Sequence, residues 1–321
     1  MPMFTRDGAD VFALCVRVTV EWPKPALQSV VAALADEQAP PPAENQHTGD
    51  PATSGLRSCH QAVYARPGTD ICVQGHVWAP GGRPVTAVKA SVSVGRHQAQ
   101  VIVVGDRVWA QKIGGVAPSD PRPFDRMPIE YERSFGGPSE ARNPVGCGLY
   151  RNAREANAKR MPNFEHYRNY LTSPSQRPTP VGLGPIPPNW QPRLSLSGTY
   201  DAQWQEQRMP YWPLDLDMRF FHSAHALLQM PQHLSGDEQL RLEGLHPDGL
   251  ILFQLPALRL QLSNQFSDRK NRQLMVLDGL DLDSDKRTCS LYYRACVPVG
   301  KGASQHTAST LRLLEPWETA P

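Results

Sequence analysis

Hydrophobic and polar residues alternate along several stretches of the first third of the chain, most clearly over residues 85–95. The hydrophobic positions of that stretch are Val88, Ala90, Val92 and Val94. Because successive side chains of a strand point to opposite faces, this period of two predicts a strand with one buried face. Strand-type runs at 70–80 and 97–109 flank it across glycine-containing turns, and 11–20 is rich in β-branched residues. We therefore expect a strand at 11–20 and a three-stranded meander over 70–109.

The last third of the chain returns to this strand-like pattern. Its runs span 239–245, 249–255, 258–265, 274–280 and 289–297. Turn signals separate them, among them His246-Pro247-Asp248-Gly249, in which proline and glycine favour a reversal of the chain. These runs predict a second sheet.

Residues 114–213 have a different character, because prolines recur every few positions and aromatic and arginine residues replace aliphatic runs. The alanine, glutamate and lysine content of 152–160 predicts a short helix. A second helix is expected over 218–230. Another short helix is expected at 25–38, before an irregular proline-rich excursion that ends near residue 58.

The proline content sets the fold class. There are 32 prolines and 24 glycines among 321 residues, and proline removes a backbone donor and fixes φ, so long helices are excluded. We expect a mainly β protein (all-β to α+β) with two antiparallel sheets or β-sandwich-like lobes. A long Pro/Gly-rich irregular region with one or two short helices would join them. The chain is treated as a single domain over 1–321, with sublobes at 1–113, 114–213 and 214–321.

The net charge and the absence of targeting signals limit the classes of partner and the cellular location that we expect. Lys and Arg number 33 against 31 Asp and Glu, and the net charge of +2 supplies no field that would gather nucleic acid. The first residues lack the basic and apolar stretches of an export signal, and no apolar run approaches the length of about 18 residues that a membrane helix needs. We expect a cytoplasmic protein that binds no nucleic acid and does not insert into a membrane.

Motifs for catalysis or metal binding are weak. Gly-x-Ser-x-Gly and the phosphate-binding glycine patterns do not occur, so no catalytic residue and no cofactor are assigned. His222 and His225, near Asp215 and Asp217, have the chemistry of a metal cluster but not the His-Glu-x-x-His spacing, and packing or capping is preferred. The run 281–285 resembles the start of a calcium loop but lacks its glycine and final glutamate, which favours a hairpin turn.

The cysteines give no metal motif either, because no Cys-x-x-Cys pair occurs and free thiols are expected. They are Cys15, Cys59, Cys72, Cys147, Cys289 and Cys296.

Glu130 and Glu132 alternate as two carboxylates on one face of a strand would, which is compatible with an acid and base pair. Arg126 and Arg133 lie beside them, and nearby cations lower carboxylate pKa values, so ion pairing is the preferred interpretation. A carbohydrate-active or peptidoglycan-active enzyme that uses one of these glutamates remains an alternative. A sugar-binding module whose tryptophans stack on sugars is a third one.

Aromatic residues are concentrated in and around the proline-rich region. They include Trp109, Trp190, Trp204, Trp212, Tyr131, Phe135, Tyr200, Phe220 and Phe221. Such rings supply large contact areas at small entropic cost, as protein-recognition surfaces require. We expect most of them to pack loops onto the sheets and a minority to face a partner.

These stretches carry a recognisable series of motifs in order. They are Pro67-Gly68-Thr69-Asp70-Ile71, 75–85, Val104-Gly105-Asp106-Arg107-Val108-Trp109, 123–137, Asn143-Pro144-Val145-Gly146, Met161-Pro162-Asn163-Phe164-Glu165, Gly182-Leu183-Gly184-Pro185-Ile186, Gly198-Thr199-Tyr200-Asp201 with Trp204, and 216–221. Over residues 11–298 the chain resembles the family of domain-of-unknown-function proteins numbered 2169 (DUF2169). It departs from the family pattern at Ser134, where alanine is more common, and in the proline-rich run 39–45.

The resemblance implies a function that the residues alone do not. Members of this family act as adaptors that bind a type VI secretion effector, keep it soluble and help place it on the VgrG spike protein. It therefore implies a non-enzymatic adaptor or chaperone with an effector as partner and the VgrG spike as a second contact. The motif positions taken as candidate partner-binding residues are Trp109, Arg126, Glu130, Tyr131, Glu132, Arg133, Phe135, Trp190, Tyr200, Trp204, Phe220 and Phe221.

Overall fold

Two six-stranded sheets form the body of the protein. The computed structural model describes residues 2–4, 10–23, 30–299 and 306–318. The first sheet has the order β1 (Pro2–Phe4), β2 (Asp10–Glu21), β22 (Thr288–Pro298), β21 (Val276–Asp283) and β7 (Asp70–Gln74), with β4 (Ala33–Leu34) paired to β2. Its neighbours are antiparallel except for β21 and β7.

The second sheet contains the predicted alternating strand. Its order is β16 (Phe164–His166), β10 (His97–Val104), β9 (Ala87–Val94), β17 (Gln239–Glu243), β18 (Ile251–Gln254) and β3 (Val30–Val31). In β9 the hydrophobic positions are buried and Lys89 is exposed, as the period of two predicts. Ser91 is buried as well, and its hydroxyl donates to Glu243 on β17.

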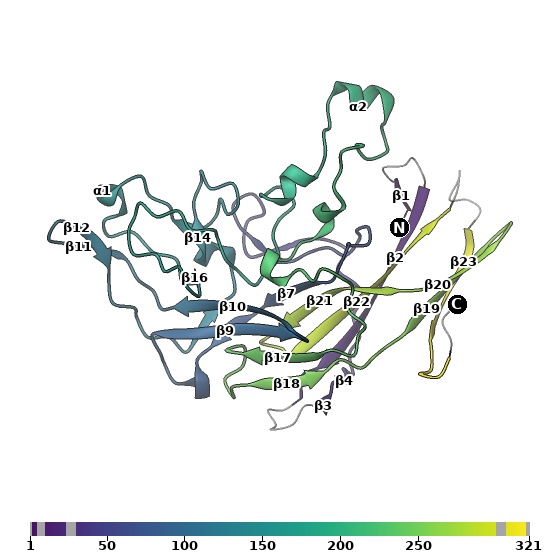
Figure 1. Cartoon of the computed structure of the whole chain (residues 1–321), viewed down its shortest axis with the longest axis horizontal. Coiled ribbons are helices and arrows are strands. Elements are labelled where there is room, and N and C mark those ends of the chain that lie inside the picture. Colours follow the sequence, from purple (N-terminus) through teal and green to yellow (C-terminus); the bar gives the residue numbers. More distant parts are fainter. Residues whose placement is uncertain (1, 5–9, 24–29, 300–305, 319–321) are drawn as a thin grey trace.

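The strands of the two ends of the chain are interleaved within these sheets. β2 pairs along its length with β22, and β9 lies between β10 and β17. Figure 1 shows β9, β10, β17 and β18 running at an angle to β2 and β22. The two sheets share one hydrophobic core, which confirms a mainly β protein of two packed sheets. Its buried members include Val20, Ile71, Val73, Leu280 and Leu291 from the first sheet and Val92, Val101, Leu240 and Phe253 from the second.

The expected three-stranded meander over 70–109 is wrong in its first strand. β7 pairs with β21 in the first sheet, whereas β9 and β10 form a hairpin in the second. The run 70–80 is broken at Gly75, whose φ of +93° leaves the extended region and whose added Cβ would lie 2.5 Å from the hydroxyl of Ser284. After this break, β8 (His76–Trp78) pairs with β13 (Arg126–Pro128).

Smaller sheets extend the body at its edges. They are the three-stranded β20 (Lys270–Leu274), β19 (Leu260–Phe266) and β23 (His306–Leu313), and the pairs β5 (Gln46–His47) with β6 (Leu56–Ser58), β11 (Trp109–Lys112) with β12 (Gly115–Pro118), and β14 (Phe135–Gly136) with β15 (Cys147–Gly148). β23 lies outside the strand-like runs of the sequence, and β20 overlaps them only at Leu274. The five predicted C-terminal strands are confirmed, but the prediction that they form one second sheet is wrong: β17 and β18 join the second sheet, β21 and β22 the first, and β19 the three-stranded one, because each pairs with strands from elsewhere in the chain.

Helices are short, as the proline content predicts. α1 (Ala153–Ala156) confirms the helix expected within 152–160, and the side chain of Asn152 caps it by accepting a hydrogen bond from Glu155 N. The helix expected over 218–230 is replaced by two 3-10 turns, Met218–Phe221 and Ala226–Leu228. α2 (Ala202–Gln207) was not predicted. The remaining 3-10 turns are Pro80–Gly82, Tyr131–Arg133 and Arg193–Leu196.

The helix expected at 25–38 is wrong for residues 30–34, which form the short strands β3 and β4, while 24–29 lie outside the described residues. The two strands gain backbone partners on β18 and β2, and tertiary pairing overrides the local preference there.

Candidate functional site

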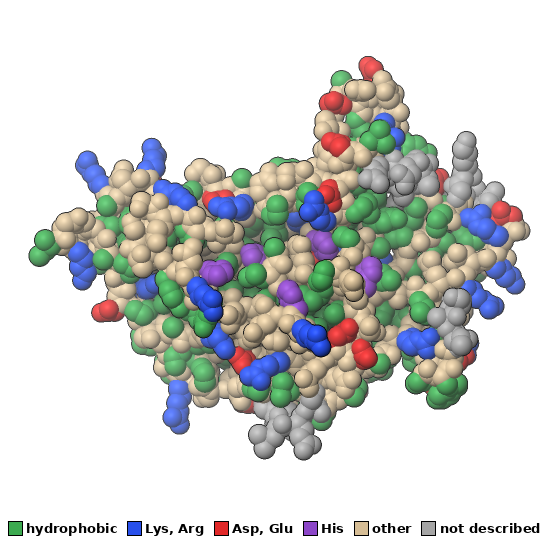
Figure 2. All heavy atoms as spheres, viewed as in Figure 1, with side chains coloured by type: hydrophobic (Ala, Val, Ile, Leu, Met, Phe, Trp, Pro, Cys, Tyr) green, Lys and Arg blue, Asp and Glu red, His purple; other side chains and the backbone are tan. Residues whose placement is uncertain are grey.

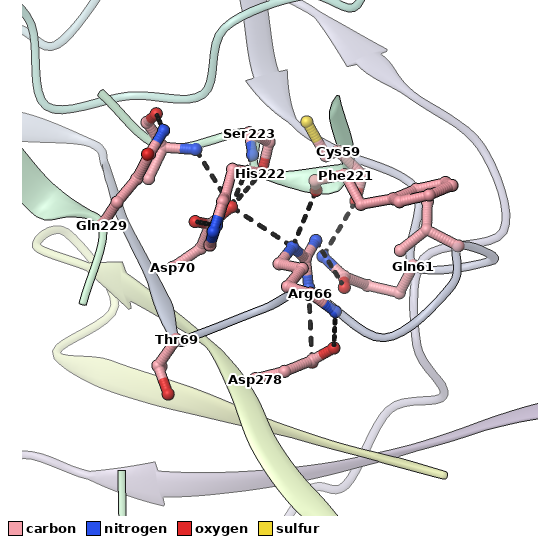
Figure 3. Close-up of polar contacts among 12 residues, drawn as sticks. Cys59, Gln61, Arg66, Thr69, Asp70, Phe221, His222, Ser223, Gln229 and Asp278 are labelled. Carbon is pink, nitrogen blue, oxygen red and sulfur yellow. Dashed lines mark hydrogen bonds and ion pairs between the residues drawn. The ribbon is translucent and has the colours of Figure 1, made fainter. Parts of the chain in front are cut away.

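A buried ionic cluster fixes the loop 58–66 and the segment 221–223 to the first sheet (Figure 3). Asp278 of β21 lies between two arginines, 2.6 Å from Nε of Arg294 and 3.3 Å from Nη1 of Arg66. Arg294 also donates to the backbone carbonyl groups of Gln61 and Val63. The loop 58–66 therefore covers the outer face of β21 and β22, which explains why most of β22 is buried on both faces.

The same cluster contains His222, a residue considered above as a metal ligand. Its Nδ1 lies 2.5 Å from Oδ1 of Asp70, and the hydroxyl of Ser223 lies 3.1 Å from Oδ2 of the same carboxylate. Burial by itself would raise the pKa of Asp70, but the hydrogen bond with His222 and the charge of Arg66 lower it below the ordinary value. Ser223 thus bonds to the carboxylate and not to the imidazole, so this arrangement does not have the order of a serine nucleophile and its base.

Neighbouring groups are also held by structural contacts. Burial raises the pKa of the Cys59 thiol to about 11, which keeps it protonated. His225 lies 3.2 Å from the carbonyl oxygen of Pro180. Asp215 accepts hydrogen bonds from the backbone and side chain of Thr199. In the described part of the chain, no three His, Cys, Asp or Glu side chains are grouped to hold a metal ion.

Many of the candidate aromatic side chains lie in the interior. Trp109 and Phe135 belong to one hydrophobic cluster, and Tyr131 meets Trp190 edge to face at 5.8 Å between ring centroids in another. Phe221 is likewise buried. These five rings belong to three small hydrophobic clusters beside the main core and are enclosed by the protein's own atoms. Phe220 is half-buried and contacts the guanidinium of Arg193.

The two glutamates of the central motif have different surroundings. Oε1 of Glu132 accepts hydrogen bonds from the Thr48 hydroxyl at 2.5 Å and from the Gly55 amide at 2.8 Å, and so holds the β5–β6 hairpin. Glu130 lines a pocket of about 510 Å³ together with His76 and other polar residues. Arg126 packs its guanidinium 5.6 Å from the ring of Trp78. The glutamates therefore do not form a facing pair at one pocket.

Arg133 follows these glutamates and faces a different hollow, which we call the arginine groove. It has a volume of about 740 Å³. Its lining residues are Asp106, Arg107, Val108, Ser119, Asp120, Arg122, Arg133 and Arg160. Three of the sequence motifs converge here, because 104–109, 123–137 and 161–165 all contribute to its walls or its support.

The buried side chain of Asn163 connects the walls of the arginine groove by hydrogen bonds. Its side-chain NH2 donates to the carbonyl of Val104 and to Asp106, and its side-chain oxygen accepts from Arg133 at 3.2 Å and Arg160 at 3.0 Å. Of the groove's arginines only Arg133 was singled out from the sequence. The polar residues of the motif blocks 104–109 and 161–165 were the available signal for the others.

A second surface feature is the arm formed by residues 198–217, which projects away from the sheets and carries α2 (Figure 1). Tyr200, Met209 and Leu214 on this arm are 53%, 62% and 66% exposed. Trp204 meets Tyr200 edge to face at 4.7 Å and donates its indole N–H to the carbonyl of Tyr211. Of the candidate aromatics, Tyr200 therefore presents an exposed ring.

Sheets, groove and arm together define the class of protein: a mainly β scaffold of two packed sheets whose irregular loops form a groove and a projecting arm at its surface. The family model described as "Uncharacterized protein conserved in bacteria (DUF2169)" matches residues 7–294, and the chain belongs to this family. No curated protein and no solved structure matches the chain. Within the described residues, every helix is too short or too polar to cross a membrane.

Proposed function

We propose that this protein is a non-enzymatic, cytoplasmic adaptor that binds a type VI secretion effector, keeps it soluble and assists its loading onto the VgrG spike. The observation that carries the proposal is the arm 198–217, which holds three large apolar side chains in water at a distance from the hydrophobic core. Exposed apolar residues that are grouped and rimmed by polar ones are typical of protein-binding surfaces. Membership of the DUF2169 family is the second support.

The composition of the arm supports a particular kind of contact. Figure 2 shows acidic and hydrophobic side chains together on the arm. Its charged residues are Asp201, Glu206, Asp215 and Asp217 against Arg208. We infer that the arm receives an amphipathic segment of the effector that carries apolar and basic side chains. Burying one large apolar side chain contributes about 1.5–3 kcal/mol, so a few such contacts suffice for a complex that can still dissociate.

The contacts of Glu130 and Glu132 support the adaptor over the glycosidase alternative. Glycoside hydrolysis needs two carboxylates at one sugar ring, one as acid and one as base or nucleophile. Glu132 accepts hydrogen bonds from the β5–β6 hairpin, whereas Glu130 lines the neighbouring pocket. The hydrogen bonds that Glu132 accepts from this hairpin have a clear role in folding.

The test is co-expression of this chain with the type VI effector encoded beside it, followed by affinity capture and size-exclusion chromatography. The arm is altered with the double substitution Met209→Asp/Leu214→Asp. Ile113→Asp is the control for introducing a carboxylate at an exposed apolar position, because Ile113 is a fully exposed apolar residue on the β11–β12 turn. Introducing two charges into a buried contact is expected to lower the affinity of the complex by at least about tenfold. The control substitution is expected to lower this affinity by less than about twofold.

The outcomes separate the two parts of the proposal. A stable complex, with an effector that is insoluble when expressed alone, supports the adaptor role. No complex and no change in effector solubility would refute that role. A complex that survives the arm substitutions unchanged would keep the adaptor role but refute the arm as its contact surface.

A further inference from the structure

We propose that the arginine groove is a binding site for carboxylate side chains of an aspartate- or glutamate-rich protein segment. Four arginines from separate parts of the chain, Arg107, Arg122, Arg133 and Arg160, line this one hollow. A guanidinium group presents N–H donors in a planar fork that matches a carboxylate. The inference does not rest on the adaptor role, because the groove and the arm 198–217 share no residue.

The charges of the groove are only partly matched within the protein. Arg107 pairs with Glu165 at 2.7 Å, and Arg133 lies 3.5 Å from Asp106 and 4.0 Å from Glu130. Arg160 donates to the side-chain oxygen of Asn163, which is neutral. Within the described residues, neither Arg122 nor Arg160 has a carboxylate at ion-pair distance. Both are exposed at the groove, so they are the two cations available to a ligand.

The groove also contains buried donors without an acceptor. Nε of Arg107 and Nε of Arg133 are shielded from solvent and make no hydrogen bond within the described structure. The side chain of Arg107 is only 9% exposed, so its orientation is fixed by its surroundings and by the bonds to Glu165 and to the carbonyl of Pro162. An unpaired N–H of a charged group is costly when buried. Nε of Arg133 has the carboxylate of Glu130 at 4.0 Å. Because both Nε atoms are shielded from solvent, the contacts to a ligand fall to Arg122 and Arg160.

The acidic residues of the rim favour peptide carboxylates over nucleic acid. Asp106, with a side chain 59% exposed, and Asp120 both line the groove, so they interrupt the positive surface and leave no continuous basic track of the kind that follows a nucleic-acid backbone. Figure 2 shows Lys and Arg side chains at the end of the molecule that carries α1, β11 and β12, but the whole chain has a net charge of only +2. A short acidic segment can place its carboxylates between the rim aspartates. The volume of about 740 Å³ is sufficient for a few side chains.

The proposal is tested by fluorescence anisotropy with the full chain and a labelled peptide of alternating glycine and glutamate. A peptide of glycine and glutamine and a labelled oligothymidine are the competing probes. The groove variant is Arg122→Gln/Arg160→Gln. The control Arg151→Gln/Arg154→Gln removes the same charge from exposed positions at and beside α1, at the same end of the molecule. Circular dichroism checks that both variants are folded.

We expect the glutamate peptide to bind at least about tenfold more tightly than the glutamine peptide. The groove variant should lose about tenfold in affinity for the glutamate peptide, and the control should change it by less than about twofold. Equal binding of the two peptides would overturn the proposal. An equal loss in the control would overturn it too, because diffuse charge would then explain binding. Tighter binding of oligothymidine would assign the groove to nucleic acid instead.

Discussion

Replacing Asp278 with asparagine should destabilise the protein strongly. Its carboxylate lies between Arg66 and Arg294, and the three side chains are at most 2% exposed. With Asp70 the cluster holds two guanidinium groups and two carboxylates, so the substitution leaves one buried positive charge unmatched. Breaking a buried ion pair by removing one partner costs about 3–5 kcal/mol. We expect a loss of that size in the free energy of unfolding for Asp278→Asn.

An ion pair at the surface provides the reference against which the loss of stability in Asp278→Asn is compared. Lys89 lies 2.8 Å from Glu243 with side chains 44% and 20% exposed, and Lys89→Gln should cost less than about 1 kcal/mol. Urea unfolding followed by tryptophan fluorescence and circular dichroism gives the free energy of unfolding of each variant. The dependence of this free energy on urea concentration should be the same for all variants if they unfold by the same two-state transition. The double variant Asp278→Asn/Arg294→Met restores the charge balance and should be less destabilised than the sum of the two single variants.

Two results would refute this reasoning. A loss below about 1 kcal/mol for Asp278→Asn would show that the cluster does not behave as a buried ion pair. Additivity of Asp278→Asn and Arg294→Met would show that the two side chains are not coupled through their charges.

Three further predictions follow from single contacts. Glu132→Ala removes the acceptor of the Gly55 amide, and limited proteolysis within 46–58 should become faster than in the parent protein. Burial raises the pKa of Asp281 to about 6, above its unfolded value, so the folded protein loses stability as pH rises from about 4 to 6 and this carboxyl ionises. Asp281→Asn should remove this loss, which is roughly 3 kcal/mol at pH 7. Thermal unfolding measured across this pH range checks the prediction. Gly105→Ala would place a Cβ 1.8 Å from the carbonyl oxygen of Arg122, and should abolish binding of the glutamate peptide; unchanged binding would contradict the geometry of the groove.

Local sequence information was sufficient where a short segment determines its own conformation. The period of two over 85–95 predicted β9 and its buried face. The composition of 152–160 predicted α1, whose capping by Asn152 involves a residue only three positions away. The failure at 25–38 has the opposite cause, because β3 and β4 are defined by strands that are distant in sequence.

The candidate site shows the same division. The motif around Glu130 and Arg133 was identified from the sequence, and the ion pairing expected there is present between these two residues at 4.0 Å. The distinct surroundings of Glu130 and Glu132 were not predicted. Glu132 contacts Thr48, 84 positions earlier in the chain, and Arg133 contacts Asn163, 30 positions later. Side chains that alternate along a chain can enter different surroundings when the segment is a 3-10 turn between loops and not a regular strand.

The sequence by itself therefore determined the β-rich class, most strands, one helix and the family resemblance, because periodicity, proline content and motif order are properties of the chain alone. Only the tertiary structure decided which strands pair, which aromatic rings are buried and which arginines converge in one groove. Arg17 on β2 and Ser290 on β22 form a hydrogen bond across 273 positions, and no local pattern encodes such a contact. Pairing at that range is selected by the fit of both sheets around a common core.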